Sequence, residues 1–94
     1  MYCVYIIRSV SLEKFYIGET KDLEERIFQH NSGFYNSAFS RKAKDWKLYF
    51  VLECNSRTQV RKIEAHIKNM KSKKYIQNLK EYPEIALKLK NKLN

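Results

Sequence analysis

Three stretches of the chain are rich in apolar residues without helical spacing, and they predict β-strands. Residues 2–8 (YCVYIIR) form a nearly continuous apolar run, which is typical of a buried strand. Residues 14–19 (KFYIGE) follow after a short connection, so the two segments are expected to pair as an antiparallel hairpin. Residues 46–53 alternate between polar and apolar and predict a third strand. The alternation assigns its side chains to two faces: Trp46, Leu48, Phe50 and Leu52 on one, and Lys47, Tyr49, Val51 and Glu53 on the other.

The other periodic segments predict four helices. Asp22, Ser56 and Ser72 precede three of them, and the side-chain oxygens of these residue types cap the N–H groups of a first helical turn. Pro83 suits the first turn of the fourth helix. The helices are expected from after Asp22 to about His30, from about Arg57 to Lys71, over a short segment after Ser72, and from Pro83 onward. The core positions expected on the first two are Leu23 and Ile27, and Val60, Ile63, Ile67 and Met70.

With a loop expected over residues 34–45, the order of elements is β-β-α-β-α-α-α. A small three-stranded antiparallel sheet flanked by helices is an α+β architecture. At 94 residues the chain is expected to form a single domain over residues 1–94. Its longest apolar run, residues 1–7, is far shorter than the ~20 residues of a membrane span and has no basic leader.

The two cysteines, Cys3 and Cys54, form no CxxC motif and no cluster with histidine. Both lie in apolar stretches, so we expect buried small hydrophobic residues rather than zinc ligands or a disulfide. A reduced, cytoplasmic protein is the expectation from these features.

The charge is unevenly distributed along the chain. The total is 19 Lys and Arg against 10 Asp and Glu, a net charge of +9. Residues 1–56 carry 8 basic and 7 acidic side chains, whereas residues 57–94 carry 11 and 3. Concentrated positive charge attracts polyanions such as nucleic acid through Coulomb steering and counterion release. A lysine-rich helical surface that serves only solubility explains the same numbers, so charge alone leaves both interpretations open.

Two short motifs and two longer segments occur in an order that resembles the GIY-YIG endonuclease family. Residues 16–18 read YIG, and residues 4–5 read VY, similar to the second half of GIY with Cys3 in place of its Gly. Residues 22–33 (DLEERIFQHNSG) resemble the segment with the essential arginine of the family, and residues 56–68 (SRTQVRKIEAHIK) resemble the helix with its metal-binding glutamate.

The resemblance covers about residues 2–80 and leaves residues 81–94 as a basic helical extension. It is strongest to the short single-domain branch related to the nuclease domain of the excision-repair incision protein.

This resemblance implies five catalytic positions and one divalent cation. Glu64 would hold Mg²⁺ or Mn²⁺, which suit a single carboxylate completed by water and phosphate oxygens. Arg26 would offer its planar donor fork to the phosphate. Tyr5 would be the general base, Tyr16 would position the water or phosphate, and His30 would assist the tyrosine.

Each of these residues also has a purely structural interpretation. Glu64 can pair with Lys68 on a helix surface, and Arg26 can pair with Asp22, each four residues away. Tyrosines are common in strands, and a histidine at the end of a helix interacts with the helix dipole. Residue types alone therefore leave the catalytic roles open, and the resemblance favours them.

Basic side chains near aromatic residues suit contact with a nucleic-acid backbone together with base stacking. The candidates for DNA binding are Lys21, Arg41, Lys42, Lys44, Lys68, Lys71, Lys73 and Lys74. Trp46, which stands beside this group, is favoured as a core residue because of its size.

The leading interpretation is a metal-dependent DNA endonuclease that hydrolyses phosphodiester bonds, with a role in DNA repair or recombination and a protein partner that supplies specificity. One alternative is a nucleic-acid-binding module with weak or no catalysis, and another is a protein-interaction domain for a repair partner. Glu19 motivates the first alternative, because the excision-repair relatives carry Lys directly after YIG and a carboxylate there repels a phosphate.

Overall fold

The computed structural model describes residues 1–32 and 43–94, and within them the predicted element order is confirmed. The elements are β1 (Tyr2–Ser9), β2 (Lys14–Thr20), α1 (Leu23–Asn31), β3 (Trp46–Cys54), α3 (Arg57–Met70), α4 (Lys73–Glu81) and α5 (Pro83–Lys92). The strands form one sheet in the order β2-β1-β3, and both pairings are antiparallel. The fold is therefore the expected α+β architecture with a three-stranded antiparallel sheet.

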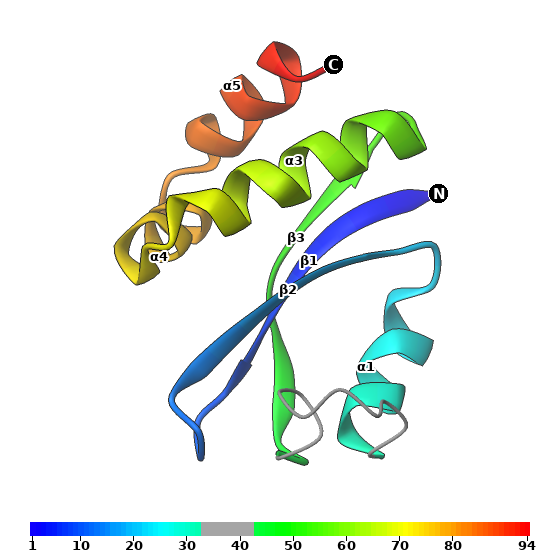
Figure 1. Cartoon of the computed structure of the whole chain (residues 1–94), viewed down its shortest axis with the longest axis vertical. Coiled ribbons are helices and arrows are strands. Elements are labelled where there is room, and N and C mark those ends of the chain that lie inside the picture. The colour runs from blue at the N-terminus through cyan, green and yellow to red at the C-terminus, as the bar shows by residue number, and fades with distance from the viewer. Residues whose placement is uncertain (33–42) are drawn as a thin grey trace.

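The sheet separates two hydrophobic clusters, one on each face. Val4 and Ile6 of β1 pack in a cluster with the apolar stripes of α3, α4 and α5, whereas Tyr5 and Ile7 pack in a second cluster with Trp46 and side chains of α1. Figure 1 shows α3 running across the strands on one side of the sheet and α1 lying on the other side. Because the central strand is covered on both faces, its sequence is continuously apolar rather than alternating.

The prediction that Trp46, Leu48, Phe50 and Leu52 share one face of the third strand is wrong. The register of β3 against β1 shifts between Ile6 and Ile7, so that Phe50 pairs with Ile6 and Leu48 pairs with Ile7. Tyr49 is the extra residue of this β-bulge, and an extra residue reverses the side-chain alternation beyond it. Trp46 therefore belongs to the α1 side, while Phe50 and Leu52 pack on the α3 side.

The predicted helix caps are confirmed. Oδ1 of Asp22 accepts from the N–H of Glu25 at 3.2 Å, and the hydroxyl groups of Ser56 and Ser72 accept from first-turn N–H groups at 3.1 and 3.0 Å. Pro83 begins α5 as expected.

The apolar stripe of α3 is confirmed at its first three positions and is wrong at the fourth. Val60, Ile63 and Ile67 are buried, but Met70 is 43% exposed. The helix ends at Met70, and Lys71 turns the chain with a φ of 48°, which leaves Met70 outside the cluster that contains Ile67. The two buried cysteines are as predicted, with free thiols.

Side-chain hydrogen bonds fix the start of β3 to the rest of the fold. The Asn31 amide at the end of α1 donates to the carbonyl of Trp46 at 3.0 Å and accepts from its N–H at 2.7 Å. The Asp45 carboxylate accepts from the Ser9 hydroxyl at 2.6 Å and from the N–H of Ser11 at 2.9 Å, and these bonds lower its pKa to about 2. Both the helix and the hairpin turn are thereby tied to one end of β3. Among the described residues, no helix is long and apolar enough to span a membrane.

Candidate active site

Tyr5 lies in the middle of the central strand, and a glycine makes the room for it. Tyr5 is 1% exposed and pairs directly with Gly18 of β2. A Cβ atom at position 18 would lie 2.5 Å from Oη of Tyr5 and 2.6 Å from its Cζ, far inside contact distance. The tyrosine ring therefore lies across the bare backbone of Gly18, and the YIG glycine has a steric role that sequence reasoning did not assign.

His30, in the last turn of α1, completes a group of three rings. Its Nε2 is 2.9 Å from Oη of Tyr5 in a buried hydrogen bond, and its ring centroid is 4.6 Å from that of Tyr16. Burial, and then the positive charge of Arg26, lower the pKa of His30 to about 4. The imidazole is therefore neutral at pH 7 and can accept or donate a proton at Nε2, depending on its tautomer.

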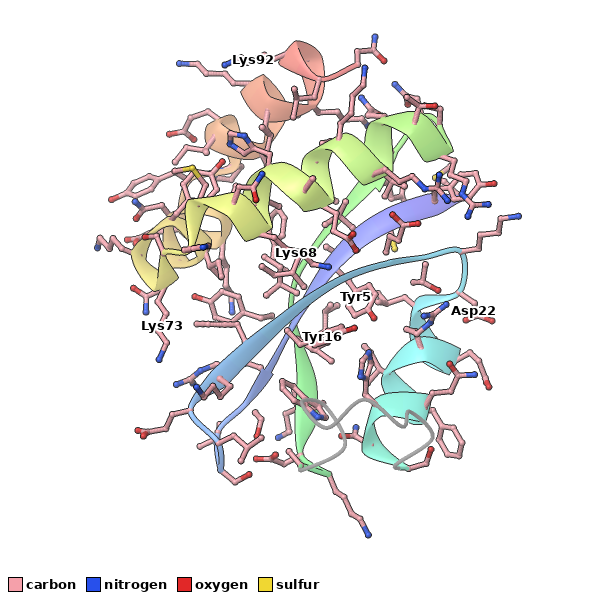
Figure 2. All side chains as sticks on the ribbon, in the orientation of Figure 1. Tyr5, Tyr16, Asp22, Lys68, Lys73 and Lys92 are labelled. Carbon is pink, nitrogen blue, oxygen red and sulfur yellow. The ribbon has the colours of Figure 1, made fainter. Side chains whose placement is uncertain are left out.

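Tyr16, on β2, lies between charged side chains from two helices. It is half-buried, and its ring centroid is 6.4 Å from that of Tyr5. Burial is the main cause that raises the pKa of Tyr16, with Glu64 of α3 raising it further and Arg26 of α1 opposing both. The structure thus brings Tyr5, Tyr16, Arg26, His30 and Glu64 together along β2, an edge strand of the described sheet. Figure 2 shows the two tyrosines together between β2 and α1.

Glu64 is the carboxylate of this site. It is half-buried on α3, and its Oε1 lies 3.5 Å from Nζ of Lys68. Burial raises the pKa of Glu64, Lys68 opposes this, and the nearby Glu19 raises it again. The predicted pair with Lys68 therefore exists, and the Glu64 carboxylate also lies near enough to Tyr16 to raise the pKa of that hydroxyl.

The donor set near Glu64 fits a hard divalent cation rather than zinc. Within residues 1–32 and 43–94, no group of three or more His, Cys, Asp or Glu side chains could hold a metal ion by itself. One carboxylate with water and substrate oxygens is the ligand set that Mg²⁺ accepts, whereas zinc sites use three or four protein ligands.

An open hollow of about 370 Å³ lies beside the site, between the start of α1 and the start of α3. Arg26 lines this hollow together with Glu19 at the end of β2, Lys21 directly after β2, and Arg57 at the start of α3. Glu19, in turn, contacts the next turn of α3, because Nε of Arg61 is 3.9 Å from its Oε1. Arg57 and Arg61 were not among the sequence-predicted residues, although their spacing to Glu64 and Lys68 is a signal that was present in the sequence.

The basic residues predicted to bind DNA are distributed more widely. Lys21 lies over the ring of Tyr2 at 5.0 Å from its centroid, beside the hollow. Lys44, Lys71 and Lys74 are exposed, and Nζ of Lys73 donates to the carbonyl of Glu13 at 3.2 Å. Lys68 lies 3.5 Å from Glu64 of the site, whereas Figure 2 shows Lys73 pointing away from the two tyrosines. Arg41 and Lys42 lie outside the described residues. Trp46 is 2% exposed, so its predicted place in the core is confirmed.

Comparison with known proteins identifies the class to which this site belongs. The profile of the GIY-YIG catalytic domain matches residues 1–78, so the chain belongs to the GIY-YIG family, whose nuclease domains act on DNA. A protein described as a UPF0213 protein, from Syntrophus aciditrophicus (strain SB), is 35% identical over 81 residues, which cover 86% of this chain and 92% of that protein. No solved structure matches the chain significantly.

Proposed function

We propose that this protein is a metal-dependent endonuclease that hydrolyses phosphodiester bonds in DNA. The observation that supports this most directly is the gathering of a buried tyrosine–histidine pair, a second tyrosine, an arginine and a carboxylate along β2. These are the groups that phosphodiester hydrolysis needs: a proton acceptor for the attacking water, donors for the phosphate, and a ligand for a hard cation.

In this proposal Tyr5 and His30 take the proton from the attacking water. The water oxygen forms a bond to phosphorus, its proton passes to Oη of Tyr5, and the proton of Tyr5 passes to Nε2 of His30. The 2.9 Å hydrogen bond supplies the path, and the lowered pKa of His30 keeps the acceptor neutral before the reaction. The raised pKa of Tyr16 keeps that hydroxyl protonated, so Tyr16 orients the water or phosphate as a donor.

Arg26 and Glu64 act on the phosphate. The Arg26 guanidinium offers two parallel N–H groups to the phosphate oxygens and stabilises the charge that develops there. Glu64 would hold Mg²⁺ or Mn²⁺, which would supply Lewis-acid stabilisation of the phosphate. The bond from phosphorus to the leaving oxygen breaks as the bond to the water oxygen forms. The ion pair between Glu64 and Lys68 is partly exposed, so it does not prevent Glu64 from binding a cation.

A second candidate is a DNA-binding module with little or no cleavage. Glu19 favours it, because this carboxylate lies close enough to Glu64 to raise its pKa and stands beside the proposed phosphate site. Arg61 partly balances the charge of Glu19. The two candidates differ in whether a divalent cation leads to cut DNA.

The deciding experiment is a cleavage panel with Mg²⁺, Mn²⁺ or EDTA on duplex, single-stranded, flap, bubble and branched DNA. We expect cutting with either cation and none with EDTA. Preference for flap, bubble or branched DNA would support a role in repair or recombination. Binding without cutting in every lane would contradict an endonuclease and favour the second candidate.

Glu64→Gln is the matched variant for this panel. It keeps the shape of the side chain and removes the charge, so we expect the cleavage rate to fall by about 10³-fold or more, while DNA binding in EDTA changes little. Glu53→Gln, on the exposed side of β3, is the control and should cut like the wild type. Wild-type cutting by Glu64→Gln would show that Glu64 is not the metal ligand.

A further inference from the structure

One side of α3 carries a row of charged residues at helical spacing. Arg57, Arg61, Glu64 and Lys68 are four, three and four residues apart, which places them on one face of a helix with 3.6 residues per turn. Glu64, the carboxylate of the proposed active site, is therefore flanked by cations on both sides along the same helix.

Two observations show that this face points toward β2 and the site. Arg57 lines the hollow that Arg26 also lines. Nε of Arg61 lies 3.9 Å from Oε1 of Glu19 on β2. Within α3, Nζ of Lys68 lies 3.5 Å from Oε1 of Glu64, the carboxylate whose charge raises the pKa of Tyr16 on β2. Figure 2 shows Lys68 between α3 and β2. The row therefore borders the site and is not turned to open solvent on the far side of the helix.

We propose that this row is the track for the cleaved DNA strand, with Arg57 and Arg61 binding phosphates on one side of the scissile bond and Lys68 on the other. The inference rests on the proposed function and adds the path of the substrate. From Arg57 to Lys68 the helix rises about 16 Å, whereas one strand of B-DNA carries a phosphate about every 3.4 Å along the duplex axis, so the row is long enough to reach more than one phosphate. The two arginines can each bind a phosphate through two N–H groups.

The acidic residues around the hollow do not prevent a phosphate from binding along this row. The three carboxylates of the hollow, on Glu19, Asp22 and Glu25, are matched by three cations, on Lys21, Arg26 and Arg57, so the hollow carries no formal net negative charge. Glu19 contacts Arg61 at 3.9 Å, a distance beyond a close ion pair, and the Arg61 side chain is 61% exposed. A phosphate can therefore reach Arg61 without breaking a buried contact.

The same helix provides a matched control. Lys62 is the immediate neighbour of Arg61 and is exposed, but its position on the helical wheel is about 100° away from Arg61. Lys88 is an exposed cation on α5. Removing Lys62 and Lys88 thus takes away the same formal charge as removing Arg57 and Arg61, without altering the proposed track.

The test compares Arg57→Gln/Arg61→Gln with Lys62→Gln/Lys88→Gln. Binding of a fluorescein-labelled duplex is measured by anisotropy in EDTA over a range of salt concentrations. We expect Arg57→Gln/Arg61→Gln, the track variant, to reduce the magnitude of the slope of log binding constant against log salt concentration by about 1.5–2, because two phosphate contacts are lost. The control, Lys62→Gln/Lys88→Gln, should reduce it by less than half of that amount. Equal losses in both variants would show that only total charge matters and would overturn the track.

A variant that keeps both positive charges shows whether the loss of binding comes from lost charge or from misfolding. Arg57→Lys/Arg61→Lys should recover most of the salt slope, because point charges still neutralise phosphates. If it remains as weak as the glutamine variant while its circular dichroism is native, the arginines do not act through phosphate contacts and the track is wrong.

Failure of the track and failure of the endonuclease are separable. Weakened binding in the track variant alone supports the track, even if the wild type cuts no substrate in the panel. A wild type that cuts, with a track variant that binds and cuts equally well, would overturn the track and leave the proposed function intact.

Discussion

Gly18 has no side chain, and this leaves the space that the Tyr5 ring occupies in the site. The two residues pair across β1 and β2, and the Tyr5 ring occupies the space where a Cβ would lie. The same ring is held at its hydroxyl by His30. A tyrosine locked at both places has a fixed hydroxyl position, which a group that transfers a proton requires.

Gly18→Ala should therefore damage the site more than the fold. The added methyl forces the Tyr5 ring away and breaks its bond to His30, so we expect a loss of about 1–3 kcal/mol in the free energy of unfolding, together with a large drop in cleavage rate. In a double-mutant cycle, Tyr5→Leu should remove most of the cost of Gly18→Ala, because the collision is gone. Full additivity of the two changes in urea unfolding would contradict this contact.

The two tyrosines are assigned different roles, and conservative variants separate them. Tyr5→Phe removes only the hydroxyl that would take the proton, so we expect a ~10²–10⁴-fold loss in single-turnover rate with little loss in binding. Tyr16→Phe should lose less, since that hydroxyl only orients the reacting groups. A normal rate for Tyr5→Phe with an inactive Tyr16→Phe would exchange the two roles, and normal rates for both would remove tyrosine from the mechanism.

Among the secondary-structure elements, the position of α1 depends on a hydrogen-bond clamp. Asn31, the last residue of the helix, bonds both the N–H and the carbonyl of Trp46 at the start of β3. Since α1 carries Arg26 and His30, this clamp sets where two of the proposed catalytic groups lie. Residue type alone does not reveal it, because Asn31-Ser32-Gly33 is also an ordinary sequence for ending a helix.

Asn31→Ala should cost about 1–3 kcal/mol in the free energy of unfolding, because it leaves two backbone groups of Trp46 without the amide that bonds them. Ser32→Ala removes an exposed side-chain bond to the carbonyl of Gln29 and is the control, with an expected loss below about 1 kcal/mol. Chemical denaturation of the three proteins measures both. Equal stability of Asn31→Ala and the wild type would mean that packing alone holds α1 in place.

For the whole molecule, the buried His30 makes stability depend on pH. The pKa of His30 is 6.5 for an unperturbed histidine and about 4 in the folded protein. Between these values the unfolded chain binds the proton and the folded protein does not. Stability therefore rises with pH across this window, and acidification from pH 7 to pH 4 should remove about 3 kcal/mol through this residue.

The measurement is the difference in urea midpoint between the wild type and His30→Gln over pH 4–7. The raised pKa of Glu64 acts with the opposite sign, and taking the difference between the two proteins reduces its contribution. The stability that the bonds to Asp45 contribute is lost mainly between pH 3.8, its ordinary pKa, and its folded-state pKa of about 2, below this window. Parallel pH profiles for the two proteins would show that His30 is readily protonated in the folded state.

The hydrophobic pattern and the capping residues were enough to predict the elements and their order. The caps at Asp22, Ser56 and Ser72 and the stripe of α3 are local signals, since each depends on residues within one or two turns of the same helix. The family motifs led to the five residues that the structure brings together along β2. The caps and the stripe are properties of neighbouring residues in the chain, which is why the sequence alone determined them. The five site residues lie on four different elements and were named only through the family resemblance.

What only the tertiary structure decided is which groups meet across elements. The bulge at Tyr49 divides β3 between two clusters, Gly18 lies under the Tyr5 ring, and Arg57 and Arg61 face β2. Each depends on strand register or on the rotation of a helix over the sheet. One inserted residue reverses the faces of a strand, and register and rotation are set by the packing of the whole core, so no local pattern in the sequence specifies them.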